Sequence, residues 1–332
     1  MKILGNDAAS LTPLKDKTIA VLGYGNQGRS QALNLRDSGL TVIVGNRIDS
    51  YSNTAEEDGF EKLDIREAAR RADVLMILTT DESQPVIWEE QIAPEVKPGD
   101  TLVWASGYNV GYELITPPAG VDVVMVAPRM PGEMVRTLFE RGTGAMAQVA
   151  VHQDASGEAW DRMMAIAKGT GCTRGGVFES SFREEAELDL FSEQVVWPGL
   201  TSWMEECFKL GVENGFSPEL MVLELYASGE SSHIFGLMAR YGFYKQMSRH
   251  STTSQYGTLT RAPRMLNDEN RARMRENLIN DIKGGAFAKE WNEEQAAGAK
   301  TLENLREKAL ASPMSQAEEE VINLVQKAVE SA

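Results

Sequence analysis

Two carboxylates stand four residues apart in the apolar stretch AELDLFSEQVVW, residues 186–197. On an α-helix four residues advance by about 400°, so Asp189 and Glu193 share one helix face, about 40° apart. Charged side chains are rarely buried unless they are paired or bind a metal. The pair is therefore a candidate cation site, and the alternative is a salt-bridged turn on a helix surface.

A glycine-rich motif near the start could bind a dinucleotide. The stretch VLGYGNQG, residues 21–28, follows a strand pattern and opens a helix pattern, the context in which G-x-G-x-x-G is informative. Gly23 permits a tight turn, Gly25 lets the backbone approach a pyrophosphate, and the helix N-terminus supplies free N–H groups. We expect the whole loop to contact the cofactor: Gly23, Tyr24, Gly25, Asn26, Gln27 and Gly28.

The residues after the second strand pattern bear on the choice of cofactor. Arg47, Ser50 and Ser52 suit a 2′-phosphate, whereas the carboxylate of Asp49 would repel it and suits a free 2′-hydroxyl. We predict NADPH, with NADH as the open alternative. Without a cofactor, the segment reads as a polar surface turn.

The elements that must position these residues alternate in the first half of the chain. Continuous apolar runs, typical of strands in a parallel sheet covered on both faces, occupy 18–25, 40–47, 72–80, 100–107, 121–128 and 144–153, with 175–180 as a seventh. Helical patterns such as 27–38 and 64–71 lie between them. From about 183 only helical patterns remain. We predict a doubly wound α/β Rossmann domain over 1–182, with a parallel sheet, and an all-α domain over 183–332.

Composition excludes several classes of protein. A net charge of −16 over 332 residues argues against a nucleic-acid partner, which requires a basic surface. No apolar run is long enough to span a membrane, and the start MKILGNDAAS lacks the apolar stretch of a signal peptide. Only two cysteines are present, which suits a reducing compartment. We expect a cytoplasmic protein with a small-molecule substrate.

Several motifs together resemble the short form of the ketol-acid reductoisomerase family: GYGNQGRSQALNLRDSGLTVIVGNR, VAPRMPGEMVR, VAVHQDASG, ELDLFSEQ and STTSQYG. The resemblance implies an N-terminal Rossmann domain and a knotted helical domain that intertwines with a second copy in a homodimer. It implies NADPH and two Mg²⁺ ions. The family shifts an alkyl group in a 2-hydroxy-2-alkyl-3-keto acid and then reduces the new 2-keto group. Asp189 and Glu193 match metal ligands of the family, and Ser251 matches its contact to the substrate carboxylate.

The chain departs from the family at positions of the chemistry. The family's AHGFN appears within WASGYNVGY, so Ser106 replaces a histidine. The family's APKGPGHTVR appears as APRMPGEMVR, so Arg129 replaces a lysine and Glu133 a histidine. Arginine is not equivalent to lysine, because it cannot give up its proton. We therefore add Arg129 and Ser106 to Asp189 and Glu193 as catalytic candidates.

The second metal position is also altered. The family has two glutamates four apart, but here Glu224 and Glu230 are six apart, and Ser228 stands four after Glu224. Six residues advance by about 600°, so the two carboxylates lie about 120° apart on a regular helix. A π-bulge or a break at Gly229 would bring Glu230 back. We expect the loss of one carboxylate, with Glu224 and Glu230 as the candidate ligands of the second ion.

Three functions are compatible with this pattern. The departures favour an NAD(P)H-dependent reductase that reduces C=O or C=N in a small carboxylic-acid-type substrate without alkyl migration, as in specialised biosynthesis. The first alternative is an authentic Mg²⁺-dependent ketol-acid reductoisomerase of branched-chain amino-acid synthesis. The second is a non-catalytic dinucleotide-binding protein.

Overall fold

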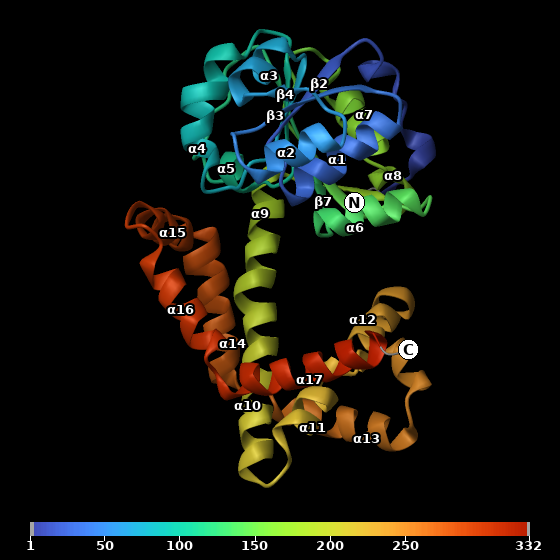
Figure 1. The fold of residues 1–332 in the computed structure, drawn as a ribbon, viewed down its shortest axis with the longest axis vertical. Coiled ribbons are helices and arrows are strands. Elements are labelled where there is room, and N and C mark those ends of the chain that lie inside the picture. The colour runs from blue at the N-terminus through green and yellow to red at the C-terminus, as the bar shows by residue number, and fades with distance from the viewer. Residues whose placement is uncertain (1–2, 331–332) are drawn as a thin grey trace. The chain divides into compact units, whose positions relative to one another are not determined.

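The computed structural model describes residues 3–330 and divides into two compact units, Met1–Asp189 and Leu190–Ala332. Figure 1 shows the chain as a ribbon and labels many of its helices and strands. The division expected after residue 182 falls at the start of helix α9 (Phe182–Phe191), and the first unit includes that helix as far as Asp189.

The first unit is built on a nine-stranded sheet with strand order β1-β9-β8-β7-β6-β5-β2-β3-β4. Each of the seven expected runs contains a strand, whereas β1 and β4, of two residues each, were not predicted. The strands are β1 Ile3–Leu4, β2 Thr18–Leu22, β3 Thr41–Gly45, β4 Lys62–Leu63, β5 Val74–Ile77, β6 Thr101–Trp104, β7 Asp122–Pro128, β8 Ala147–Gln153 and β9 Val177–Glu179.

The sheet is mixed rather than wholly parallel, which corrects one expectation. Strands β4, β3, β2, β5, β6 and β7 are parallel, but β8 runs antiparallel to β7 and β1 antiparallel to β9. The reason lies in the connection after β7. Pro128 at the end of β7 pairs with Ala147 at the start of β8, so the intervening segment returns to the same sheet edge instead of crossing back. The resulting antiparallel pair needs no crossover.

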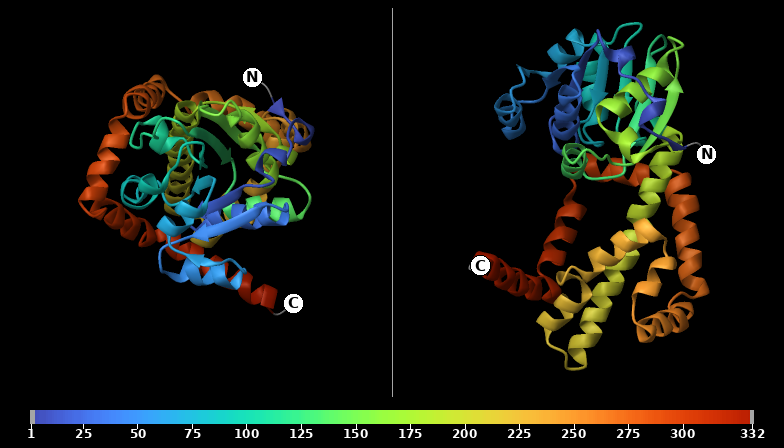
Figure 2. Two further views of the ribbon diagram at one scale, coloured as in Figure 1. Left: turned by 90° about the horizontal axis from the view of Figure 1, so that it is seen from above. Right: turned by 90° about the vertical axis from the view of Figure 1, so that its right-hand side faces the viewer.

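Helices cover both faces of this sheet (Figure 2). Ile19 and Val21 of β2 pack in one core with side chains of α1 and α7, whereas Ala20 and Leu22 pack in a second core with α3. Burial on both faces explains the continuous apolar runs. The helices of the unit are α1 Asn26–Asp37, α2 Ser50–Glu57, α3 Ile65–Arg71, α4 Gln84–Ile87, α5 Tyr108–Gly111, α6 Gly132–Glu140, α7 Ala159–Gly169, α8 Cys172–Gly175 and α9, with a π-helical turn η3 at Trp88–Ile92.

The second unit is helical throughout its described part, as expected. One buried cluster of this unit consists of Phe208, Val222, Ala317 and Val321. Along the described chain, no helix is both long and apolar enough to cross a membrane. The elements are α10 Trp197–Glu213, α11 Pro218–Val222, α12 Glu230–Tyr241, α13 Thr252–Arg261, α14 Asp268–Glu276, α15 Ala286–Ala296, α16 Lys300–Leu310 and α17 Pro313–Glu330, with π-helical segments η5 Ser192–Val196, η6 Leu223–Ala227 and η9 Asn277–Lys283.

Candidate functional site

The three glycines of the loop have the geometry of a dinucleotide site. Gly23 has a φ of 99°, and a Cβ there would lie 2.7 Å from the Thr79 nitrogen. A Cβ on Gly28 would lie 1.9 Å from the Gly23 carbonyl oxygen, so α1 packs directly on the loop. Gly25 at the N-terminus of α1 has nothing within 4 Å of its Cβ position. The first and third glycines are therefore required by packing, and the second leaves open space at the N-terminus of α1, which is where a dinucleotide motif binds a pyrophosphate.

The side chains of the loop are bonded to the segment that follows β7. Asn26 Oδ1 accepts a hydrogen bond from the Glu133 backbone N–H at 2.9 Å, and Gln27 Nε2 donates one to the Met130 carbonyl at 2.9 Å. A Cβ on Gly132 would lie 2.1 Å from the Asn26 carbonyl oxygen. Asn26 and Gln27 therefore hold the two loops together, and their contact with a cofactor stays a prediction.

Tyr24, between the first two glycines, is buried in the framework of the loop. Its backbone N–H donates to Asn46 Oδ1 at 3.0 Å, and its hydroxyl donates to Asp58 Oδ2 at 2.9 Å. Arg29 Nε donates to the same oxygen at 2.7 Å. Burial, and then the bond to Asp58, raise the pKa of Tyr24. Tyr24 thus holds the loop in place through its bonds to Asn46 and Asp58.

The segment predicted to contact the 2′-phosphate begins a helix and is not a free loop. Asp49 caps α2 by accepting from the Ser52 N–H at 3.2 Å, while the Ser52 hydroxyl donates to the Asp49 carbonyl at 2.8 Å. Arg47, whose side chain is 81% exposed, donates through Nε to Asp49 Oδ2 at 2.7 Å. Burial opposes ionisation of Asp49, but the bonds from Arg47 and Ser52 leave its pKa below the usual value. The 2′-phosphate contacts of Arg47, Ser50 and Ser52 stay predictions.

A charged cluster lies at the carboxyl ends of β6 and β7. Arg129, which follows β7, donates through one guanidinium nitrogen to Glu185 Oε1 at 2.7 Å and through the other to Asp189. Glu185 is buried, and its second oxygen accepts from the Gly107 N–H at 2.6 Å. Burial raises the pKa of Glu185 to about 7, against the opposing Gly107 bond and Arg129 charge. The pKa of Arg129 is raised, because the attraction of Asp189 and Glu185 outweighs burial.

Ser106 belongs to the same region. It follows β6 and its Oγ accepts from the Tyr108 N–H at 3.2 Å. A Cβ on neighbouring Gly107 would lie 1.9 Å from the Phe182 carbonyl oxygen, so the start of α9 packs directly on this turn. Sequence reasoning missed Glu185. A signal was present, because Glu185 precedes Asp189 by the same four residues that separate Asp189 from Glu193.

The remaining predicted ligands belong to the second unit. Glu193 lies in η5 and Glu224 in η6, and Gly229 has a φ of 80° just before Glu230 begins α12. Both features that would restore the glutamate pair, a π-helical turn and a break at Gly229, are therefore present. Ser251 caps α13, and its Oγ accepts from the Ser254 N–H at 3.1 Å. Contact of Ser251 with the substrate carboxylate stays a prediction.

The donor chemistry of Asp189 fits a divalent cation. Its carboxylate is 39% exposed and already binds a cation, the guanidinium of Arg129. Within residues 3–330, no group of three or more His, Cys, Asp or Glu residues is arranged to hold a metal. Metal binding by Asp189, Glu193, Glu224 and Glu230 stays a prediction.

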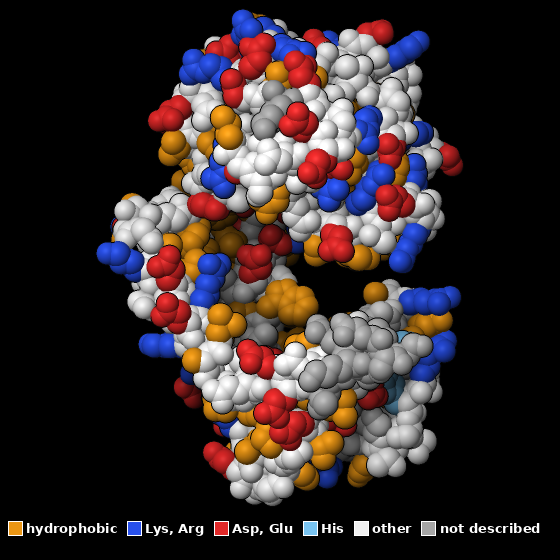
Figure 3. All heavy atoms as spheres, viewed as in Figure 1, with side chains coloured by type: hydrophobic (Ala, Val, Ile, Leu, Met, Phe, Trp, Pro, Cys, Tyr) orange, Lys and Arg blue, Asp and Glu red, His pale blue; other side chains and the backbone are white. Residues whose placement is uncertain are grey.

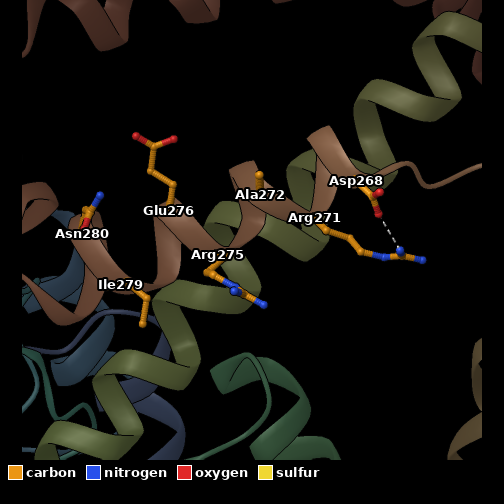
Figure 4. A pocket seen from close by; sticks show the side chains of 7 residues that line it. All are labelled: Asp268, Arg271, Ala272, Arg275, Glu276, Ile279 and Asn280. Carbon is orange, nitrogen blue, oxygen red and sulfur yellow. Dashed lines mark hydrogen bonds and ion pairs between the residues drawn. The ribbon is translucent and has the colours of Figure 1, made fainter.

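Surface hollows occur in both units. One of about 780 Å³ begins at Gly25 and Asn26 and runs over α1 towards Arg36 and Glu140. On the face shown in Figure 3, acidic and basic side chains are interspersed over the first unit and form no basic patch. In the second unit a hollow of about 620 Å³ follows α14 and η9 (Figure 4) and is lined by Asp268, Arg271, Ala272, Arg275, Glu276, Ile279 and Asn280.

Both units match family models. Residues 13–176 match the NADPH-binding domain of acetohydroxy acid isomeroreductase, and residues 182–327 match the C-terminal domain of ketol-acid reductoisomerase. The chain is 47% identical over 315 residues to a ketol-acid reductoisomerase (NADP(+)) of Pyrobaculum islandicum, covering 94% of each chain. It is 48% identical over 329 residues to a putative ketol-acid reductoisomerase 3 of Saccharolobus solfataricus, covering 97% of each.

A solved structure agrees with these matches. An NADH-preferring ketol-acid reductoisomerase from an uncultured archean superimposes with a TM-score of 0.93 at 37% identity, covering 98% of this chain and 99% of that one. The fold class and the resemblance expected from the motifs are confirmed. The chain belongs to the ketol-acid reductoisomerase family of NADP-dependent oxidoreductases.

Proposed function

We propose that this chain is an NADPH-dependent ketol-acid reductoisomerase that requires Mg²⁺. The observation that carries the proposal is the near full-length identity of 47% to a relative of that name. The names of the relatives favour this first alternative over the reductase without alkyl migration, which the departures had favoured, and over a non-catalytic protein.

The first unit supplies groups suited to this reaction. The C2 hydroxyl loses its proton as the alkyl group moves with its bonding electrons from C2 to C3, so C2 becomes a ketone and the C3 carbonyl oxygen becomes an alkoxide that takes a proton. A hydride and a further proton then reduce the C2 ketone. Arg129 is held by two carboxylates and donates hydrogen bonds to a developing oxyanion. Glu185, with a pKa of about 7, can accept or donate a proton near neutral pH. When bound, Mg²⁺ polarises the carbonyl group and NADPH supplies the hydride.

A second candidate, reduction without migration, is supported by the charged cluster. Arg129 stands where the family has a lysine, and it bonds to Glu185 and Asp189 together. This ion pair competes with a metal for the Asp189 carboxylate. Ser106 replaces the imidazole of the family motif. Migration depends more than reduction on stabilised oxyanion charge, so these changes bear mainly on the first step.

One experiment separates the two candidates. Purified protein with Mg²⁺ and NADPH is given 2-acetolactate, and separately the 3-hydroxy-2-keto acid that migration would produce. Under the proposal both substrates are converted to the same 2,3-dihydroxy acid, identified by mass spectrometry. Turnover of the 3-hydroxy-2-keto acid alone would instead establish the second candidate.

Two variants sharpen this comparison. Arg129→Lys restores the family residue, and it is expected to increase acetolactate turnover at least tenfold only if the arginine limits migration. Arg71→Lys is the matched control, because Arg71 pairs with Glu61 on the exposed surface. It should leave both activities unchanged.

The assembly follows from the same proposal. A homodimer with intertwined helical domains would cover apolar side chains that are exposed on the described second unit, among them Trp197 at 52% and Phe235 at 48%. Light scattering on the purified protein tests this, and a monomer at micromolar concentration would contradict it. A cytoplasmic location stays a prediction.

A further inference from the structure

Three buried polar atoms without a hydrogen-bond partner lie close to the carboxyl ends of β5 and β6. They are Thr79 Oγ1, Tyr108 OH and Asn109 Oδ1. Gln84 connects the segments that carry them: its Nε2 donates to the Thr79 carbonyl at 2.9 Å, and its Oε1 accepts from Asn109 Nδ2 at 3.0 Å. Tyr108 is 8% exposed and Asn109 1% exposed. Thr79 is half-buried. Gln84 thus joins the segments of Thr79 and Asn109, and Tyr108 directly precedes Asn109 in the chain.

Such atoms are costly to leave unpaired. A buried donor or acceptor without a partner loses its hydration and gains no bond in return. Buried polar groups of folded proteins are nearly always satisfied, so these three exceptions require an explanation. The carboxyl edge of an open α/β sheet is where such folds bind ligands. A ligand that bonds to these atoms removes the cost.

The strand order indicates which ligand group reaches them. β2 carries the glycine loop and lies between β3 and β5. Arg47, the predicted phosphate contact, follows β3, so the adenosine half of a dinucleotide is expected on that side. The other half then extends over β5 and β6, the strands that precede Thr79 and Tyr108. That half carries ribose hydroxyls and a carboxamide, which offer both donors and acceptors to two hydroxyl groups and one amide oxygen.

We propose that Tyr108, together with Thr79 and Asn109, binds the nicotinamide riboside half of the dinucleotide through its buried hydroxyl. This proposal rests on dinucleotide binding and is independent of whether the alkyl group migrates. In the family motif AHGFN a phenylalanine stands at this position, so the hydroxyl is a departure of this chain from that motif. Burial, and then the charge of Asp81, raise the pKa of Tyr108 to about 12, so the group donates a proton in a hydrogen bond throughout the neutral range.

The test removes the hydroxyl alone. Tyr108→Phe keeps the ring, and the matched control is Tyr112→Phe, whose ring centroid lies 5.2 Å from that of Tyr108. Dissociation constants are measured by calorimetry for NADP⁺, for ADP-ribose 2′-phosphate, which lacks nicotinamide, and for 2′,5′-ADP, which lacks both nicotinamide and its ribose. Tyr108→Phe should weaken NADP⁺ about tenfold and leave 2′,5′-ADP unchanged. The control should change none of the three.

The two cofactor fragments show which part of the cofactor the Tyr108 hydroxyl contacts, and they also show whether the proposal is wrong. A loss for NADP⁺ alone assigns the hydroxyl to the carboxamide, and a loss that extends to ADP-ribose 2′-phosphate assigns it to the ribose; both support the proposal. Unchanged NADP⁺ affinity, or an equal loss for 2′,5′-ADP, overturns it. The melting temperature of the cofactor-free protein is a second readout. It should be unchanged or higher in Tyr108→Phe, because an unpaired polar group is removed, whereas a decrease would show that the hydroxyl serves the fold.

Discussion

Replacing Glu185 by glutamine should change how the stability of the protein depends on pH. Glu185→Gln keeps the shape of the side chain and an oxygen that accepts from the Gly107 N–H, but it cannot ionise. In the wild-type protein, burial raises the pKa of Glu185 from its usual 4.5 to about 7. The folded protein therefore binds a proton more tightly than the unfolded chain does.

The sign and size of the effect follow from linkage. Below pH 4.5 the carboxyl is protonated in both states and makes no difference. As the pH rises to about 7 the unfolded chain ionises first, so the wild-type protein loses stability across this window. The gap between the two pKa values corresponds to about 3 kcal/mol, at about 1.4 kcal/mol for each pH unit. The variant lacks this loss, so its stability relative to wild type should rise by about 3 kcal/mol from pH 4.5 to 7.5.

Calorimetric melting of both proteins at intervals of half a pH unit measures this. For a unit of this size the change corresponds to roughly 6–12 °C in the difference between their melting temperatures. Glu184→Gln, at an exposed neighbouring position on α9, is the control and should show no such trend. Parallel curves for Glu185→Gln and wild type would refute the reasoning. A trend of opposite sign would show that Arg129 keeps Glu185 ionised.

Two further substitutions test the cofactor loop and the segment after β3. Gly28→Ala should destabilise the protein by about 1–3 kcal/mol, because its Cβ would overlap the Gly23 carbonyl. Gly25→Ala should leave the melting temperature unchanged but abolish cofactor binding, because its methyl group fills the open space. Equal melting temperatures for the two variants would contradict this. Arg47→Ala should weaken the binding of NADPH tenfold or more and that of NADH little. Asp49→Asn, which keeps the helix cap, should shift the preference towards NADPH. Binding titrations with both cofactors measure this, and equal losses of affinity in Arg47→Ala would show that Arg47 does not contact the 2′-phosphate.

Much of the first unit could be predicted because strands buried on both faces leave long apolar runs. The direction of β8 could not be predicted, because an apolar run does not show whether a strand lies parallel or antiparallel to its neighbour. The two-residue strands β1 and β4 are too short to show a period. The helix that Asp49 caps was missed because Ser52 stands where a capping box usually has Glu or Gln, so the segment resembled a polar turn.

The site could be predicted only where the signal is local. The glycine motif and the Asp189–Glu193 spacing lie within a few residues of chain. Glu185 was missed because its partners are remote: Gly107 is 78 residues away and Arg129 is 56 residues away. Charged residues on a helix suggest a hydrated face until such partners are known. The raised pKa of Glu185 is thus a property of the tertiary structure.

The hydrogen bonds between the glycine loop and the segment after β7 hold these two loops together as one rigid unit. Asn26 holds the Glu133 N–H, Gln27 holds the Met130 carbonyl, and Gly132 leaves no space between them. Arg129 is the first residue of this segment, so its backbone belongs to the part of the structure that would bind the pyrophosphate, and Glu185 and Asp189 hold its guanidinium. In a chimera that joins this first unit to the helical unit of another family member, the substrate preference should therefore follow the helical unit. The position of the Arg129 guanidinium relative to the bound dinucleotide should stay the same. Redesign of such enzymes can therefore transfer the first unit as a whole and keep this geometry.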